Sequence, residues 1–216
     1  MTDPDAVLVL GSASPARLAT LRAAGIEPVV VVSGVDESQV GDLPPAELAL
    51  QLAEVKCAAV AARDDLPAGA LVLGCDSVLE LGGETLGKPG DAETARARWR
   101  EMRGRSGVLH TGHALRDTAA DRVAAATAST VVHFADLTDD EIEAYVATGE
   151  PLDVAGAFTV DGLGGAFVTG IEGDHHNVVG LSLPLLRDLL AELGHSWTGL
   201  WRPRSRQGPP APPASA

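Results

Sequence analysis

Cysteine is scarce in this chain, and long apolar runs are missing. Its two cysteines, Cys57 and Cys75, have no metal-binding spacing, so a reducing compartment is the simplest environment. No apolar run approaches the roughly 20 residues that span a bilayer. No basic stretch followed by a signal-type apolar segment opens the sequence. We therefore expect a cytoplasmic protein without a membrane partner.

Positive charge is also in short supply. The chain has 16 lysines and arginines against 30 aspartates and glutamates, which gives a formal net charge of −14. A protein that neutralises many phosphates along DNA or RNA needs a basic face, so we expect no nucleic-acid polymer as partner. A small anionic ligand remains compatible with this charge, because a few local cations suffice to bind it.

The chain does contain alternating strand-like and helix-like segments. Apolar, β-branched runs predict strands at 7–10, 28–33 and 70–74, paired strands at 107–115 and 122–135, and short strands at 166–168 and 177–179. Helical patterns occur at 14–25, 44–59, 91–102, 138–149 and 182–193. These segments predict a single α/β domain over residues 1–200, with a mixed, twisted sheet flanked by helices, and a disordered proline-rich tail over residues 203–216.

The first predicted strand stops at Gly11, and a helix follows at once. Ser14 has the chemistry of an N-cap and Pro15 that of the first helical position. One interpretation is a tight turn that binds nothing. The other is an anion site, in which outward-pointing backbone N–H groups and the hydroxyls of Ser12 and Ser14 surround the anion. Arg17 favours the second interpretation, because a cation in the first helical turn otherwise opposes the helix dipole.

Charged side chains next to predicted strand ends or turns are candidates for chemistry, because α/β sheets bind ligands there. They are Arg17, Glu37, Lys56, Asp76 and Lys88. Cations that neutralise phosphates, with carboxylates that hold Mg²⁺ or Mn²⁺ and deprotonate water, are what cleavage of a phosphoanhydride requires. Three of these residues also have an ordinary structural interpretation. Asp76 caps a turn, Lys88 is solvated, and Lys56 extends its ammonium from an apolar helix face into water.

The histidines give a weaker signal. His110 and His113 are three residues apart in a predicted strand, which places them on opposite faces, so we do not expect them to share a metal ion. His175 and His176 are also expected to point in different directions. The sequence lacks the GxSxG motif of serine hydrolases.

Nine segments occur in an order that is specific to one family. They are GSASPAR (11–17), VDES (35–38), LAEVKCAAV (52–60), GCDS (74–77), GKP (87–89), HTGH (110–113), YVATGEPLDVAGAF (145–158), DGLGGAFV (161–168) and NVVGLSLPLL (177–186). Together they resemble the Maf family of nucleoside triphosphate pyrophosphatases, also called septum formation proteins. The resemblance spans nearly all of residues 7–193.

The resemblance implies a cleft in the α/β fold and a nucleoside triphosphate diphosphatase, which hydrolyses the bond between the α and β phosphates to a monophosphate and pyrophosphate. It also implies a divalent cation (Mg²⁺ or Mn²⁺), a homodimer, and a house-cleaning role in nucleotide metabolism. Carried over by position, the catalytic residues are Asp76, the proton acceptor, with Glu37, Lys56 and Lys88. Asp76 and Glu37 are also the implied metal ligands. The implied substrate-binding residues are Ser12, Ser14, Arg17, Ser77 and Asp161.

The chain departs from the family pattern at four positions of the site. Ser77 stands where the family often has a threonine. Ala16 stands where the family usually has the first of two arginines, and Val154 replaces the lysine of its DKAG segment. Asp161 stands where one branch of the family has a glutamine. A carboxylate only accepts hydrogen bonds, whereas an amide also donates them, so this chain should recognise a different edge of the nucleobase. Because of Val154, a non-catalytic nucleotide-binding regulator of septation is the alternative function.

Overall fold

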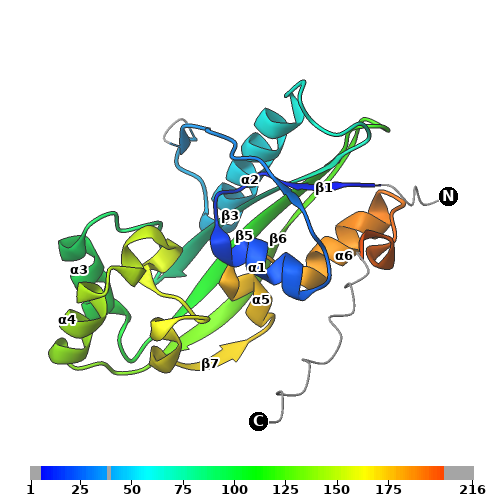
Figure 1. Cartoon of the computed structure of the whole chain (residues 1–216). Coiled ribbons are helices and arrows are strands. Elements are labelled where there is room, and N and C mark those ends of the chain that lie inside the picture. Colours follow the sequence, from blue (N-terminus) through cyan, green and yellow to red (C-terminus); the bar gives the residue numbers. More distant parts are fainter. Residues whose placement is uncertain (1–5, 38–39, 202–216) are drawn as a thin grey trace, which may run out of the picture.

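One mixed, twisted β-sheet runs through the structure, a computed structural model that describes residues 6–37 and 40–201 (Figure 1). The strand order is β2-β1-β3-β5-β6-β7, with β4 paired to the end of β3. β1 is parallel to β2 and β3, and the other neighbours are antiparallel. The strands are β1 (Leu8–Leu10), β2 (Val29–Val30), β3 (Leu71–Leu81), β4 (Glu84–Leu86), β5 (Ser106–Asp117), β6 (Arg122–Phe134) and β7 (Val168–Glu172).

Helices cover both faces of this sheet. Because successive strand residues point to opposite faces, Leu8 and Leu10 pack in one core with α1 and α6, whereas Val9 packs in another core with α2. The α-helices are α1 (Pro15–Ala23), α2 (Pro45–Ala61), α3 (Ala92–Met102), α4 (Asp139–Ala147), α5 (His175–Val179) and α6 (Leu183–Glu192). Single 3₁₀ turns are η2 (Glu150–Asp153), η3 (Ala155–Ala157), η4 (Leu163–Phe167) and η5 (Trp197–Leu200).

Two glycines let α2 lie directly on the sheet. A Cβ added to Gly74 in β3 would stand 2.7 Å from the amide nitrogen of Cys57, and one added to Gly112 in β5 would stand 2.6 Å from Leu50 Cα. Real Cβ atoms do not approach that closely, so a larger residue at either position would push the helix away. The close approach brings the side chains of α2 within reach of the middle of β3.

The far ends of β3, β5 and β6 carry a further core, built around Trp99 of α3. This fully buried indole makes edge-on contacts with Phe134, Tyr145 and Phe167, and its N–H donates to the carbonyl of Ala157 at 2.8 Å. α3 and α4 lie together at this end of the sheet, away from α2 and α6 (Figure 1). The segment from η2 to η4 is thereby anchored against the sheet.

The predicted fold class is confirmed, and so is the helix start predicted at Ser14 and Pro15. Ser14 caps α1, and Thr138 and Glu141 form a reciprocal capping box at α4. Other expectations are wrong. Residues 177–179 belong to α5 rather than to a strand, and the predicted strand at 28–33 shortens to β2. The strand predicted at 70–74 continues to Leu81, because the residues that follow pair with β5.

Two expectations concern the ends of the chain and the membrane. The predicted disordered tail, residues 203–216, lies outside the described residues. Over the described ranges, none of the helices combines the length and the apolar character needed to cross a bilayer.

Candidate active site

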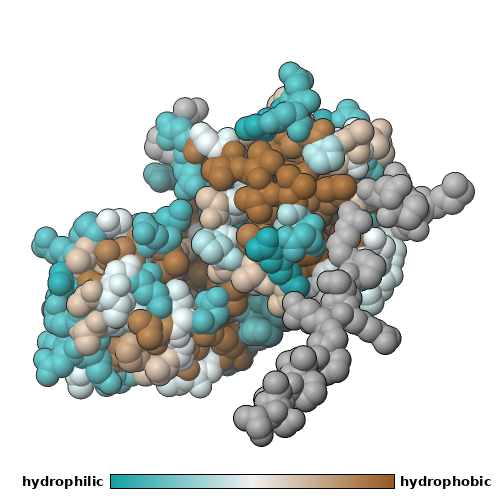
Figure 2. Space-filling model, viewed as in Figure 1, coloured by the Kyte–Doolittle hydropathy of each residue, from teal (hydrophilic) through white to brown (hydrophobic). Residues whose placement is uncertain are grey.

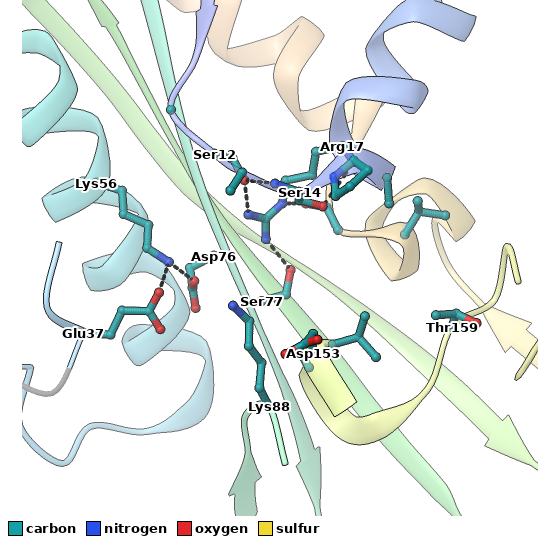
Figure 3. A pocket seen from close by; sticks show the side chains of 18 of the residues that line it. Ser12, Ser14, Arg17, Glu37, Lys56, Asp76, Ser77, Lys88, Asp153 and Thr159 are labelled. Carbon is teal, nitrogen blue, oxygen red and sulfur yellow. Dashed lines mark hydrogen bonds and ion pairs between the residues drawn. The ribbon is translucent and has the colours of Figure 1, made fainter. Parts of the chain in front are cut away.

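A pocket of about 530 Å³ is lined by the turn before α1, the middle of β3 and residues of the segment 153–161 (Figure 3). The molecular surface is indented between the end that carries α3 and α4 and the rest of the molecule (Figure 2). The lining of the pocket comes from segments far apart in sequence, and all the predicted site residues lie in it: Ser12, Ser14, Arg17, Glu37, Lys56, Asp76, Ser77, Lys88 and Asp161. A volume of this size accommodates a ligand as large as a nucleotide. The structure therefore brings the predicted residues together in one place.

An ammonium group between two carboxylates forms one side of the pocket. Lys56 Nζ of α2 pairs with Asp76 Oδ1 of β3 and lies 2.6 Å from Glu37 Oε1. The side chains of Lys56 and Asp76 are 11% and 13% exposed, whereas that of Glu37 is 47% exposed. Partial burial alone would raise the pKa of Glu37, but the hydrogen bond and charge of Lys56, with further positive charge from Lys88 and Arg17, lower it below its ordinary value.

Arg17 is held in place by the protein itself. Its Nε donates to Gly180 O at 2.7 Å, Nη1 donates to Ser12 Oγ and Cys75 O, and Nη2 donates to Ser77 Oγ. A guanidinium has five N–H donors, so a single one remains for a ligand. Arg17 is 9% exposed. The structure thus places Arg17 in the lining as an anchor that fixes Ser12 and Ser77, and leaves it little capacity to bind phosphate directly.

The two serines of the turn before α1 accept hydrogen bonds from its backbone. Ser12 Oγ accepts from the backbone N–H of Ser14 at 3.2 Å, and Ser14 Oγ accepts from the N–H of Arg17 at 3.4 Å. Both hydroxyls line the pocket beside the first turn of α1. Across from them, Ser77 Oγ lies 2.9 Å from Thr111 Oγ1, which fixes its orientation on β3.

The opposite wall comes from the loop after β4 and from the segment 153–161. Lys88 is exposed and points into the pocket toward Asp76 and Ser77 (Figure 3). The backbone before it is fixed, because the carbonyl of Gly87 accepts from Arg98 and from the N–H of Gly156 at 3.1 Å. Asp153 and Thr159 also face this space (Figure 3).

Comparison with known proteins identifies the family. The family model described as "Maf-like protein" matches residues 7–193. The chain belongs to the Maf family. It is 61% identical over 207 residues to a protein of Streptomyces avermitilis, which covers 95% of this chain and 100% of that protein. It is 64% identical over 196 residues to one from Streptomyces coelicolor (91% and 95%) and 61% identical over 211 residues to one from Salinispora tropica (97% and 93%). Each relative is named "Nucleoside triphosphate pyrophosphatase".

The lysines of this Maf protein are concentrated in the pocket. The chain has only two lysines, Lys56 and Lys88, and both line it. All other cationic side chains that are always charged are arginines, and several of those on α3 pair with α4 instead, as Arg96 does with Glu143 at 2.6 Å. Both lysine ammonium groups of the chain therefore lie at this one site.

The donor set of the pocket fits a hard divalent cation. Asp76 and Glu37 each present a carboxylate, and carboxylate oxygens are the ligands that Mg²⁺ and Mn²⁺ prefer. Lys56 contacts Oδ1 of Asp76 and Oε1 of Glu37, which leaves the second oxygen of each carboxylate for an ion. In the described part of the chain, one group of three metal-ligating side chains lies close together, namely Asp174, His175 and His176. These three residues are not part of the pocket lining.

The two pairs of histidines lie on different elements of the structure. His110 and His113 do lie on β5, where His110 Nε2 is 2.9 Å from Glu80 Oε2 and His113 is fully buried. The expectation for His175 and His176 is wrong, since both lie on a helix and their rings stand 3.8 Å apart.

Several pocket residues were not predicted from the sequence. Asp153, Phe158, Thr159 and the turn from Val178 to Gly180 all line it. Asp153 has a usable signal, since it precedes Val154 in the DVAG segment that resembles the family pattern. Phe158 and residues 178–180 also lie within segments that resemble the family pattern. Thr159 lies outside those segments and has no such signal.

Proposed function

We propose that this Maf-family protein is a nucleoside triphosphate pyrophosphatase that hydrolyses the α–β phosphoanhydride to a nucleoside monophosphate and pyrophosphate. One observation carries the proposal. The pocket holds two carboxylates bridged by Lys56, with Lys88 and the serine turn facing them. This arrangement offers a proton acceptor, positive charge and hydroxyl donors around one space, which is what phosphoanhydride cleavage needs.

The residues have separable roles in this proposal. Asp76 takes a proton from the attacking water, while Lys56 holds the carboxylates of Asp76 and Glu37 in fixed orientation. Water attacks one of the two phosphorus atoms of the α–β bridge, and the bond between that phosphorus and the bridging oxygen breaks. The electron pair stays on the bridging oxygen of the other product, so that nucleoside monophosphate and pyrophosphate form. Ser12, Ser14 and Lys88 bind phosphate oxygens and neutralise the charge that develops on them.

Asp76 and Glu37 would hold the divalent cation. When bound, Mg²⁺ or Mn²⁺ supplies Lewis-acid stabilisation of phosphate charge. Lys56 keeps the two carboxylates together, since it contacts both of them.

Pyrophosphate release tests the function. The purified protein is given Mg²⁺ or Mn²⁺ and a panel of normal and modified nucleoside triphosphates. Asp76→Asn removes the proton acceptor and should lower the rate by about a hundredfold or more. Asp91→Asn is the matched control, because Asp91 caps α3 without being part of the lining and asparagine caps equally well.

The alternative function predicts another result. A non-catalytic regulator of septation would bind nucleotides tightly and release no pyrophosphate from any of them. The names of the relatives favour hydrolysis over this alternative. Together with hydrolysis we propose the cytoplasm as location and removal of modified nucleotides as the cellular role.

A further inference from the structure

The wall of the pocket opposite the lysine and the two carboxylates is a loop without regular structure. Residues 158–162 connect η3 to η4, and Phe158, Thr159 and Asp161 of this loop line the pocket. Thr159 lies on the far side of the pocket from Lys56 and Glu37 (Figure 3). A loop that lacks its own backbone ladder needs other contacts to keep one conformation.

One carboxylate ties both ends of the loop together. Glu150, at the start of η2, accepts from Thr159 Oγ1 at 2.5 Å, from the N–H of Leu163 at 3.0 Å and from the N–H of Gly164 at 3.0 Å. Asp161 lies at the tip between these anchor points. Burial alone would raise the pKa of Glu150, but the hydrogen bonds from Thr159, Leu163, Gly164 and Tyr145 lower it. The group therefore stays a pure acceptor at neutral pH.

Tyr145 adds a second connection to the same loop. This residue is the chain's only tyrosine, and its hydroxyl donates to Glu150 Oε1 at 3.0 Å while accepting from the N–H of Thr159 at 3.3 Å. Burial is the main cause that raises the pKa of Tyr145, to about 12, so the hydroxyl keeps its proton. Its ring packs edge-on against Trp99, which fixes it in the core.

The loop wraps closely around this carboxylate. A Cβ added to Gly162 would stand 2.7 Å from Glu150 Oε2, and one added to Gly164 would stand 2.8 Å from the carbonyl of Thr159. Glu150 itself is not part of the pocket lining. Any effect it has on a bound nucleotide must therefore pass through the residues of the loop.

We propose that Glu150 is a positioning residue for base discrimination, and this proposal rests on the proposed function. A triphosphate at Lys56, Lys88 and the serine turn leaves the nucleobase to the loop 158–162. Thr159 of this loop lies on the far side of the pocket from Lys56 (Figure 3), and Asp161 also lines the pocket. Glu150 holds that loop in one conformation. Discrimination between bases depends on polar groups held in fixed positions, because a misplaced group no longer pairs with the correct edge.

The test compares Glu150→Gln with Glu141→Gln. Glutamine keeps the size of the side chain but replaces one accepting oxygen by a donor, which would face the donors of the loop. Glu141 is the matched control because it also accepts backbone and hydroxyl hydrogen bonds near the same core, from Thr138, without contacting the loop. The measurement is the ratio of kcat/KM between the best and the worst of ATP, GTP, CTP, UTP and dTTP.

We expect Glu150→Gln to lower this ratio by about tenfold or more, with the loss mainly in KM for the best nucleotide, and Glu141→Gln to leave it unchanged. An unchanged ratio in Glu150→Gln, or an equal fall in Glu141→Gln, would overturn the proposal. If Glu150→Gln does not fold, Tyr145→Phe removes the hydroxyl that contacts Glu150 and the N–H of Thr159 without changing a residue of the lining, and it should lower the ratio in the same direction.

Binding of α,β-methylene nucleotide analogues separates this proposal from the hydrolysis proposal. If the wild-type protein releases no pyrophosphate, the proposed function fails, but the ratio of Kd values among the analogues still reports base discrimination. Glu150→Gln should then reduce that ratio. Hydrogen exchange at the amides of Leu163 and Gly164 should accelerate in the same variant, and unchanged protection would count against the role of Glu150 in holding the loop.

Discussion

Lys56 and Asp76 form an ion pair at the base of the pocket, with 11% and 13% of their side-chain surfaces exposed. Lys56 comes from α2 and Asp76 from the middle of β3, and the two meet because Gly74 lets the helix lie directly on the strand. Charges that are this far removed from water are tolerated only when paired. The pair is therefore a structural element as well as a part of the site.

Replacing Lys56 by methionine should destabilise the fold. The change removes the ammonium that contacts the carboxylates of both Asp76 and Glu37, and breaking a buried pair costs about 3 kcal/mol. Urea unfolding measures the loss. Adding Asp76→Asn to Lys56→Met should recover part of it, because the uncompensated charge is removed. Strict additivity of the two single effects would contradict the pairing argument.

Lys88→Ala should act on substrate use alone. Lys88 is exposed at the pocket, so its removal costs little folding free energy but takes away a charge that neutralises phosphate. We expect kcat/KM for a nucleoside triphosphate to fall by about tenfold or more, with an unchanged unfolding midpoint. Arg187→Ala removes an exposed cation from α6 and serves as the control. Equal kcat/KM values for the two variants would rule out the assigned role of Lys88.

The parts of the site that the sequence predicts are those with a local physical signal. Ser14 and Pro15 indicate a helix start after an apolar strand, and the structure places Ser12 and Ser14 in the lining. Asp76 follows an apolar run, although the expectation that the strand ends there is wrong. Whether that carboxylate faces a pocket depends on pairing with β5, and pairing partners more than 30 residues away leave no local pattern.

The parts that could not be predicted depend on distant contacts. The place of Arg17 in the first helical turn predicts that it binds phosphate. Its guanidinium instead donates to Cys75 O and Gly180 O, which lie 58 and 163 residues further along the chain. The loop of Thr159 has no periodic pattern, and its hydrogen bonds to Glu150 and Tyr145, 9 and 14 residues earlier in the chain, leave no signal in the sequence. Neither arrangement follows from periodicity or propensity, since both arise from tertiary packing.

Arg17→Lys tests whether Arg17 supplies charge or structure. Lysine keeps the charge but lacks the planar guanidinium that donates to four separate acceptors. Ser12, Ser77 and two backbone carbonyls therefore lose donors. We expect a loss of about 2–4 kcal/mol in the free energy of unfolding, measured by chemical denaturation. Arg22→Lys, which changes an exposed arginine on the same helix, should be close to neutral. If Arg17→Lys keeps full stability, Arg17 acts through its charge.

Asp161→Asn should change base preference. The carboxylate of Asp161 presents only acceptors to the pocket, whereas an amide also presents two N–H donors. Nucleotides whose base edge offers donors should lose affinity relative to those that offer acceptors, by about tenfold in the ratio of kcat/KM. A panel of nucleoside triphosphates at fixed metal concentration measures this ratio. A proportional fall for every base would mean that Asp161 does not contact the base.

His113 gives the fold a specific dependence on pH. Its Nε2 accepts from the N–H of Ser182 at 2.9 Å, so Nδ1 carries the proton and donates to Thr111 O at 3.0 Å. Burial, with the positive charge of Arg17, lowers the pKa of His113 to about 4. Protonation would place a second donor against the Ser182 N–H. The neutral ring therefore stabilises the fold fully above the unfolded pKa near 6.5. That contribution falls as the pH drops toward the folded pKa, because the unfolded state binds the extra proton.

The expected loss between pH 7 and pH 4 is up to about 3 kcal/mol from this residue. Urea unfolding of the wild type and of His113→Gln over this range measures it, because the longer glutamine side chain can place an amide oxygen near the position of Nε2 and accept from the Ser182 N–H without titrating. The variant should be less stable at pH 7 but show a shallower decline. Since the pairs His195–Asp117 and His110–Glu80 remain in both proteins, subtracting the two curves removes their share. Parallel curves would show that His113 binds its proton as readily in the folded protein as in the unfolded chain.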